Sequence, residues 1–170
     1  MAEVLFITNT DLKRKTYLNG SIDADKILPY IKLAQDIYLE NYLGTKLFDK
    51  IKTLISSGDI NLVANADYKF LLDSYIKPTT IHSALVEYLP NAAYRVTNQG
   101  IYKHLPENAE TVDKNEVDFL IEKQRNLANV YAKRMIDYLC SYGRLFPEYY
   151  TNKNNDIYPN DDSLKSSWLL

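Results

Sequence analysis

The amino-acid sequence predicts an all-α fold: a helical bundle of about four to five helices with one long internal loop or small hairpin and an extended C-terminal tail. Apolar side chains recur at helical spacing through most of the chain. Only 5 of the 170 residues are glycine, which argues against a series of tight β-hairpins. This length fits one domain with a sizeable core. We therefore expect a bundle domain over residues 1–145 and a tail over residues 146–170.

The N-terminal region predicts an anchored turn followed by a long helix. The apolar run at residues 4–7 precedes Thr8 and Thr10, either of which can cap a brief helical turn. Asp23 or Asp25 can then cap the first long helix. Its inward face is expected to carry residues spaced three or four apart, namely Ile27, Ile31, Ala34, Tyr38 and Tyr42.

A tight helical hairpin is predicted at Gly44. Glycine fits the left-handed position that ends a helix, and Thr45 fits the cap of the next one. The second arm is expected to end at Gly58, before a partly extended loop over residues 59–65. The buried stripe of this arm is predicted to be Leu47, Phe48, Ile51, Leu54 and Ile55.

Two further helices precede the internal loop. The third covers residues 66–76, and Pro78 begins the fourth because proline restricts the residue before it. Pro90 should bend the fourth helix, since proline removes a helical hydrogen bond, and the bent helix is expected to run to about Val96. In the third helix, the side chains expected to face inward are Phe70, Leu71 and Tyr75.

The helical pattern fails over residues 97–112 and then returns in the longest helix. Loops of this length are usually functional or mobile, so the segment either holds a short hairpin or becomes ordered only against a partner. Asp113 and Glu116 have the spacing of a capping box, and the helix that they open should run to Gly143. Its inward face is predicted to be Val117, Leu120, Ile121, Gln124, Ala128, Tyr131, Met135, Tyr138, Leu139 and Tyr142.

Side chains suited to catalysis or metal binding are not grouped in the sequence. Cys140 is the only cysteine, which excludes an intrachain disulfide, and we interpret it as a small buried apolar side chain. His82 and Glu87 are five residues apart and do not share a helical face, and His104 lies in the loop. No glycine-rich nucleotide loop or serine nucleophile motif occurs. We predict that the protein is not an enzyme and uses no cofactor or metal.

The overall charge disfavours binding to nucleic acids. The 20 Lys and Arg residues nearly balance the 22 Asp and Glu residues, so no strong field would hold the chain on DNA. No stretch approaches the roughly 20 apolar residues of a membrane span, and no secretion signal is recognisable. The 15 tyrosines supply rings with polar tips, which suit surfaces that become buried on assembly. We expect a protein made in a cytoplasm that binds copies of itself and neighbouring proteins.

The C-terminal tail is polar but has an apolar tip. We expect few of its residues to build a core, so that deleting residues 146–170 should leave a folded bundle that assembles poorly. The tail would dock on a partner, or Trp168 would instead fold back on its own domain. The residues expected to contact partners are Tyr149, Tyr150, Tyr158, Trp168, Leu169 and Leu170 in the tail and Ile101 and Tyr102 in the internal loop.

Several short segments carry a family resemblance. They are Ile-Thr-Asn-Thr-Asp-Leu (7–12), Ala-Gln-Asp (34–36), Tyr-Leu-Gly-Thr-Lys-Leu-Phe (42–48), Thr-Asn-Gln-Gly-Ile (97–101), Arg-Met-Ile-Asp-Tyr-Leu (134–139) and Phe-Pro-Glu-Tyr (146–149). Together they resemble the head-to-tail connector (adaptor) proteins of tailed bacteriophages, and are most similar to those of phages that infect Bacteroidetes hosts.

The resemblance implies a structural virion protein of the neck. Such connectors are helical bundles that assemble, usually as a dodecamer, into a ring beneath the portal protein. The ring extends the DNA channel toward downstream neck or tail proteins, and DNA passes through it without sequence-specific binding. The family also implies that the internal loop projects from the bundle and that the C-terminal segment reaches the portal or a neighbouring subunit.

Two other classes of function are considered from the residues alone. A helical regulatory or partner-binding protein without catalytic activity would fit the same fold, and a DNA-binding version should show salt-dependent affinity. A hydrolase that used Cys140 or His82 would need partner groups that the sequence does not place beside them.

Overall fold

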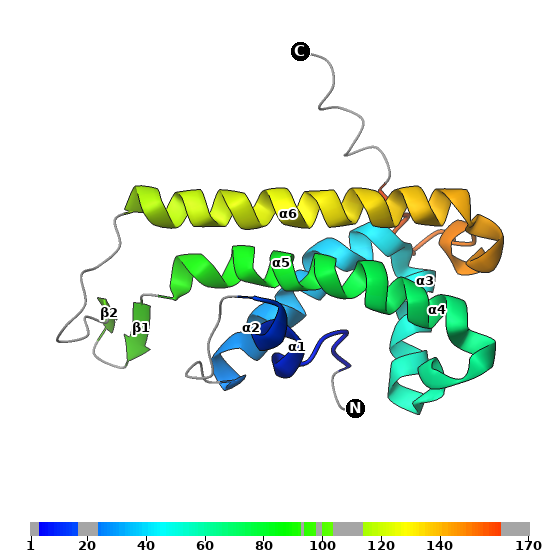
Figure 1. Ribbon diagram of the computed structural model, residues 1–170, viewed down its shortest axis with the longest axis horizontal. Helices are drawn as coiled ribbons and strands as arrows, with labels where there is room; N and C mark the ends of the chain where they lie inside the picture. The colour runs from blue at the N-terminus through cyan, green and yellow to red at the C-terminus, as the bar shows by residue number, and fades with distance from the viewer. Residues whose placement is uncertain (1–3, 17–23, 93, 98–99, 104–113, 161–170) are drawn as a thin grey trace, which may run out of the picture.

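The chain is all-α, with one small β-hairpin (Figure 1). This computed structural model describes residues 4–16, 24–92, 94–97, 100–103 and 114–160. The α-helices are α1 Asn9–Lys15, α2 Ala24–Ala34, α3 Glu40–Ser57, α4 Ala66–Leu71, α5 Lys77–Tyr88 and α6 Lys114–Ser141. Two π-helical turns, η1 Gln35–Leu39 and η4 Leu72–Ile76, join α2 to α3 and α4 to α5. The 3-10 turns are η2 Asp59–Asn61, η3 Val63–Asn65, η5 Leu89–Asn91, η6 Gly143–Leu145 and η7 Pro147–Tyr150, and the strands are β1 Tyr94–Thr97 and β2 Gly100–Lys103.

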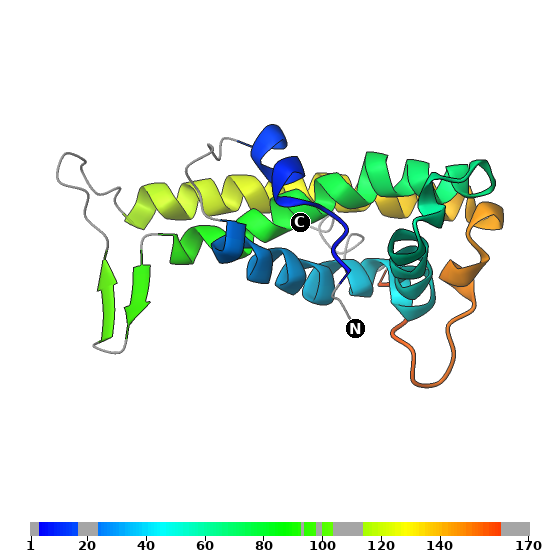
Figure 2. The same ribbon diagram turned by 90° about the horizontal axis from the view of Figure 1, so that it is seen from below.

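Helix α5 lies in the middle of the bundle. It packs against α6 on one side and α2 on another, and α6 runs antiparallel to it (Figures 1 and 2). Helix α1 crosses α2 and α5. The core has two parts, one around α1, α2 and α5 and a larger one around α3, α4 and the C-terminal half of α6. Among the described residues, the helix that packs most extensively against α6 is therefore α5.

The N-terminal anchor is confirmed. Thr8 caps α1, because its Oγ1 accepts the Asp11 N–H at 3.1 Å while an Asp11 carboxylate oxygen accepts the Thr8 N–H at 3.0 Å. The buried Gln35 side chain accepts the Phe6 N–H at 2.7 Å and donates to the Val4 carbonyl at 3.2 Å. This glutamine satisfies backbone groups that burial would otherwise leave unpaired. The proposed caps Asp23 and Asp113 lie outside the described residues.

The prediction of a tight helical hairpin at Gly44 is wrong. The helical run turns one corner at Gly44 and then leads away from α2 instead of packing back along it (Figures 1 and 2). Gly44 has φ 73° and ψ 156°, so its ψ is extended rather than that of a left-handed helical residue. Gly58, with φ 80° and ψ −4°, does end α3 in the predicted left-handed conformation.

Residues 152–160, here named the C-terminal strap, cap the helix that restarts after this corner. The Asn152 Oδ1 accepts the Lys46 N–H at 3.1 Å, and the Thr45 N–H donates to the Ile157 carbonyl at 3.1 Å. The Ile157 N–H returns a bond to Thr45 Oγ1 at 2.9 Å. The Asn160 N–H donates to the Asn41 carbonyl at 2.8 Å. The strap therefore satisfies amides that a helix start leaves without intrahelical partners.

Few residues after 145 belong to the core, as expected, but two large side chains among them do. Phe146 is fully buried and Tyr149 is 5% exposed, and both belong to the larger part of the core. The Phe146 ring meets Tyr68 edge-on, with ring centroids 5.4 Å apart. Residues 146–160 thus fold with the bundle, and removing them would take away two core side chains as well as the strap.

The third and fourth helices are continuous, with irregular turns at both prolines. The π-helical turn Leu72–Ile76 precedes Pro78, and the helix after it ends at Tyr88, short of the predicted Val96, because Pro90 lies in a 3-10 turn. Phe70 is half exposed rather than inward. Residues 59–65 form two 3-10 turns instead of an extended loop, with Ile60 buried.

The predicted hairpin alternative is confirmed for the described part of the internal loop. Strands β1 and β2 pair antiparallel, and Thr97 lies opposite Gly100. The long helix is also confirmed as α6 Lys114–Ser141, whose buried residues are Gln124, Ala128, Ala132, Met135, Ile136 and Leu139. Cys140 is exposed, not buried as predicted, because Leu139 takes the inward position and the next residue lies about 100° further round the helix.

Candidate protein interface

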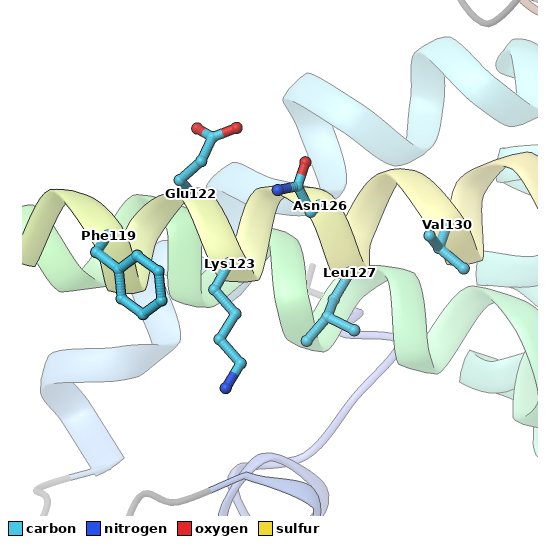
Figure 3. A pocket seen from close by; sticks show the side chains of 6 residues that line it. All are labelled: Phe119, Glu122, Lys123, Asn126, Leu127 and Val130. Atoms are coloured by element: carbon cyan, nitrogen blue, oxygen red, sulfur yellow. The ribbon is translucent and has the colours of Figure 1, made fainter.

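The outer face of the N-terminal half of α6 exposes apolar side chains. Phe119 is 69% exposed and Val130 is 47% exposed. They lie at the two ends of a shallow hollow of about 460 Å³, here named the α6 hollow (Figure 3). Its lining residues are Phe119, Glu122, Lys123, Asn126, Leu127 and Val130. Phe119 and Val130 are therefore available for contact with another protein.

The α6 hollow is lined by one acid, Glu122, and one base, Lys123, and the neighbouring Arg125 pairs with the acid. The Glu122 carboxylate is paired with the Arg125 guanidinium at 2.6 Å, so this acid is compensated within α6. Lys123 lies in the middle of the hollow, and its side chain extends along the same side of the helix as Leu127 (Figure 3). The hollow thus combines apolar contact area with a cation that can select an acidic partner.

A second exposed apolar surface lies at the other end of α6. Tyr142, Leu145 and Tyr150 line a shallow hollow of about 620 Å³ together with Cys140 and Arg144. The Tyr150 hydroxyl donates to the Leu139 carbonyl at 3.2 Å, which holds the ring across the end of the helix. Gly143 makes this possible, since a Cβ there would lie 2.5 Å from the Tyr150 ring.

The residues predicted to bind partners are only partly exposed. Tyr150 and Tyr158 are exposed, as a contact surface requires. Tyr149 is buried, so its assignment as a partner contact is wrong: its ring packs in the core and meets Tyr150 edge-on at 5.1 Å. Ile101 and Tyr102 lie on β2, opposite Val96 and Arg95. The other predicted contacts, Trp168, Leu169 and Leu170, lie outside the described residues.

The hairpin and the α6 hollow lie toward the same end of the bundle. Figures 1 and 2 place β1 and β2 beside the start of α6, beyond the end of α5. Sequence reasoning missed Phe119, Leu127 and Val130 as site residues. The available signal was their apolar character at positions outside the inward register that Gln124, Ala128 and Met135 define.

Polar side chains of the bundle make structural pairs. His82 Nδ1 lies 2.8 Å from the Gln124 Oε1, and the His82 ring stacks on Tyr131 with centroids 5.4 Å apart. Within the described residues no three His, Cys, Asp or Glu side chains are grouped for metal binding. The search of the same residues for a helix long and apolar enough to cross a membrane also found none.

Two tyrosines are held as hydrogen-bond donors inside the fold. The Tyr38 hydroxyl donates to Glu87 at 2.6 Å, and the Tyr68 hydroxyl donates to Glu148 at 2.7 Å. Burial, followed by the bond to Glu87 and its charge, raises the pKa of Tyr38 to about 12. Burial and Glu148 likewise raise the pKa of Tyr68. Both rings therefore stay neutral and keep distant segments together at ordinary pH.

We expect the Tyr38 bond to make stability depend on alkaline pH. Because the folded pKa lies above the unfolded value near 10, the contribution is full below pH 10 and is lost as the pH rises through about 12. Replacing Tyr38 by Phe should lower the urea midpoint at pH 8 and weaken its decline above pH 10. The exposed Tyr158→Phe change is the control. An unchanged decline in the Tyr38 variant would contradict this assignment.

Comparison with known protein families gives a match that covers most of the chain. A model described as a family of unknown function, DUF6712, matches residues 39–159. The chain belongs to this family. The DUF6712 region begins at the end of η1 and runs through the strap, so it includes both sides of the Gly44 corner. No curated protein and no solved structure matches the chain.

Proposed function

We propose that this DUF6712 protein is a head-to-tail connector of a tailed bacteriophage. In this role, copies of the chain form a dodecameric ring below the portal protein at the neck of the virion, where the ring joins the portal to downstream neck or tail proteins. DNA would pass through the ring without sequence-specific contacts. The protein would act by assembly and not by catalysis.

The observation that carries the proposal is where the connector-like segments lie in the fold. The segment 7–12 contains the capping box of α1, and Gln35 ties the N-terminal segment to η1. The segment 42–48 forms the Gly44 corner, and the segment 97–101 includes the last residue of β1 and the start of β2. Each of these segments thus forms a recognisable feature of the fold. This supports a resemblance to connectors in the whole fold and not only in short sequence motifs.

The exposed surfaces are also those of an assembling protein. The α6 hollow and the surface around Tyr142 and Tyr150 offer apolar area on opposite halves of one helix. The hairpin extends from the end of the bundle, as the internal loop of a connector would (Figure 2). The near-neutral charge of the whole chain suits packing against protein more than gripping DNA.

Mixing the full chain with the portal protein of the same phage tests this function. We expect native mass spectrometry to show several copies bound per portal, and electron microscopy to show a ring on one portal face. A chain shortened to residues 1–160 is the informative variant, because it keeps Phe146 and the strap. It should fold normally and bind the portal less tightly if residues 161–170 reach it.

One outcome would contradict the connector function, and another would contradict only the role of the C-terminal residues. A full chain that stays monomeric and never joins the portal would contradict the connector function. Normal binding by the 1–160 chain would remove the role proposed for Trp168 and its neighbours while leaving the connector function in place.

A further inference from the structure

The corner between α3 and α4 presents two aliphatic side chains to solvent. Val63 is 93% exposed and Leu62 is 55% exposed, and both belong to a segment without charged residues between Asp59 and Asp67. We name Leu62 and Val63 the apolar knob. Their exposure is not needed for the fold, since Ile60 alone from this segment enters the core. Both side chains are therefore available for contact with another protein.

The apolar knob is held in one conformation by hydrogen bonds on both sides. The Leu62 N–H donates to the Asp59 carbonyl at 2.9 Å, and the Asn65 N–H donates to the Leu62 carbonyl at 2.9 Å. The Asn65 side chain also donates to the Asp59 carbonyl at 2.9 Å. A segment ordered in this way loses little conformational entropy on binding.

The charges around the apolar knob oppose the charge of Lys123 in the α6 hollow. Asp59 and Asp67 flank the knob and are exposed, and the nearby Lys69 is paired with Asp73 at 3.3 Å. Lys69 also donates to the Asn61 side chain beside the knob at 3.1 Å, so the acidic excess there comes from Asp59 and Asp67 together with Asp73. The α6 hollow has Lys123 at its centre, while its acid Glu122 is compensated by Arg125. A contact between this side of the knob and Lys123 would combine apolar contact area with opposite charges.

We propose that the apolar knob of one copy docks into the α6 hollow of a second copy. The knob lies at the α3–α4 end of the bundle and the hollow lies on the half of α6 toward the opposite end (Figure 1). Each copy thus offers two different surfaces, and a contact between them is heterologous, which generates a ring where the rotation between copies closes. The inference rests on the proposed function and adds to it the surfaces through which the ring forms.

Two substitutions that block opposite surfaces provide the main test. Val63→Asp removes the knob and leaves the hollow, while Phe119→Asp removes the hollow and leaves the knob; both residues are exposed, so both variants should fold. In sedimentation and native mass spectrometry over a concentration series, each should self-associate at least roughly tenfold more weakly than the wild type. An equimolar mixture should form a heterodimer and stop there. Leu33→Asp, on the exposed face of α2, is the matched control.

A charge exchange tests the orientation of the same contact. Lys123→Glu and Asp67→Lys should each weaken association, by roughly two- to fivefold for a partly exposed pair. The two changes in one chain should restore much of the loss, since every knob then carries the lysine and every hollow the glutamate.

The outcomes separate this inference from the connector function. The knob-and-hollow contact would be overturned if wild-type copies stayed monomeric both alone and with the portal. It would also be overturned if Val63→Asp and Phe119→Asp left the association unchanged. Portal-bound rings that tolerate both substitutions would overturn the contact and leave the connector function standing. If Val63→Asp abolished binding of a single copy to the portal but left contacts between copies unchanged, the knob would be a portal contact, and the inference would again be overturned. Association through these surfaces without portal binding would support the contact and contradict the connector function.

Discussion

Replacing Phe146 by Ala should destabilise the protein by about 3–5 kcal/mol, a large part of the stability of an ordinary domain. Phe146 has no exposed surface, and it packs against the rings of Tyr68 and Tyr138 at centroid distances of 5.4 and 5.9 Å. The residue lies just after α6, between two 3-10 turns that fix its position. The surroundings therefore have little freedom to fill the cavity.

Urea unfolding followed by circular dichroism measures this effect. Tyr158→Ala is the control from the same C-terminal region, because Tyr158 is exposed and its loss should change stability by less than about 0.5 kcal/mol. Chain shortening gives an independent comparison: residues 1–145 should fold poorly, whereas residues 1–160 should unfold like the full chain. A stable Phe146→Ala variant together with a well-folded 1–145 chain would restore the original division at residue 145.

Much of the fold could be predicted because most elements depend on local patterns. The period of apolar residues predicted α6, and the Thr8 capping box is contained within a few residues. The Gly44 corner and the place of residues 146–160 could not be predicted in the same way. Both depend on contacts between Thr45, Lys46 and residues more than a hundred positions later, such as Asn152 and Ile157, which no local pattern encodes.

The candidate surfaces show a similar division. Tyr150 and Tyr158, which the sequence suggested as partner contacts, are exposed, as such contacts require. Sequence reasoning misplaced Tyr149 because it cannot tell two adjacent tyrosines apart, and only the fold decides which of them faces the core. The α6 hollow was missed for a related reason: the sequence shows that Phe119 is apolar and outside the inward register, but its exposure depends on the neighbours of α6.

Replacing Gly44 by Ala should cost about 3 kcal/mol or more, through two effects that can be separated. The first is backbone strain, because φ 73° with ψ 156° is a conformation that L side chains rarely adopt. The second is a collision with the strap: an added Cβ would lie 2.7 Å from the Asn152 Nδ2 and 2.9 Å from the Pro159 Cδ. Moving Asn152 would also break its bond to the Lys46 N–H, which caps the second half of α3.

Gly58→Ala separates strain from collision. Gly58 also has a positive φ of 80°, but nothing lies within 4 Å of the added Cβ, so this variant should lose only about 1 kcal/mol. A double-mutant cycle with Asn152→Ala then tests the strap directly. Because both changes remove the same contact, Gly44→Ala should cost less in the Asn152→Ala chain than in the wild type. If both glycine variants lost the same free energy of unfolding, or if the cycle were strictly additive, the position of the strap would not depend on glycine at residue 44.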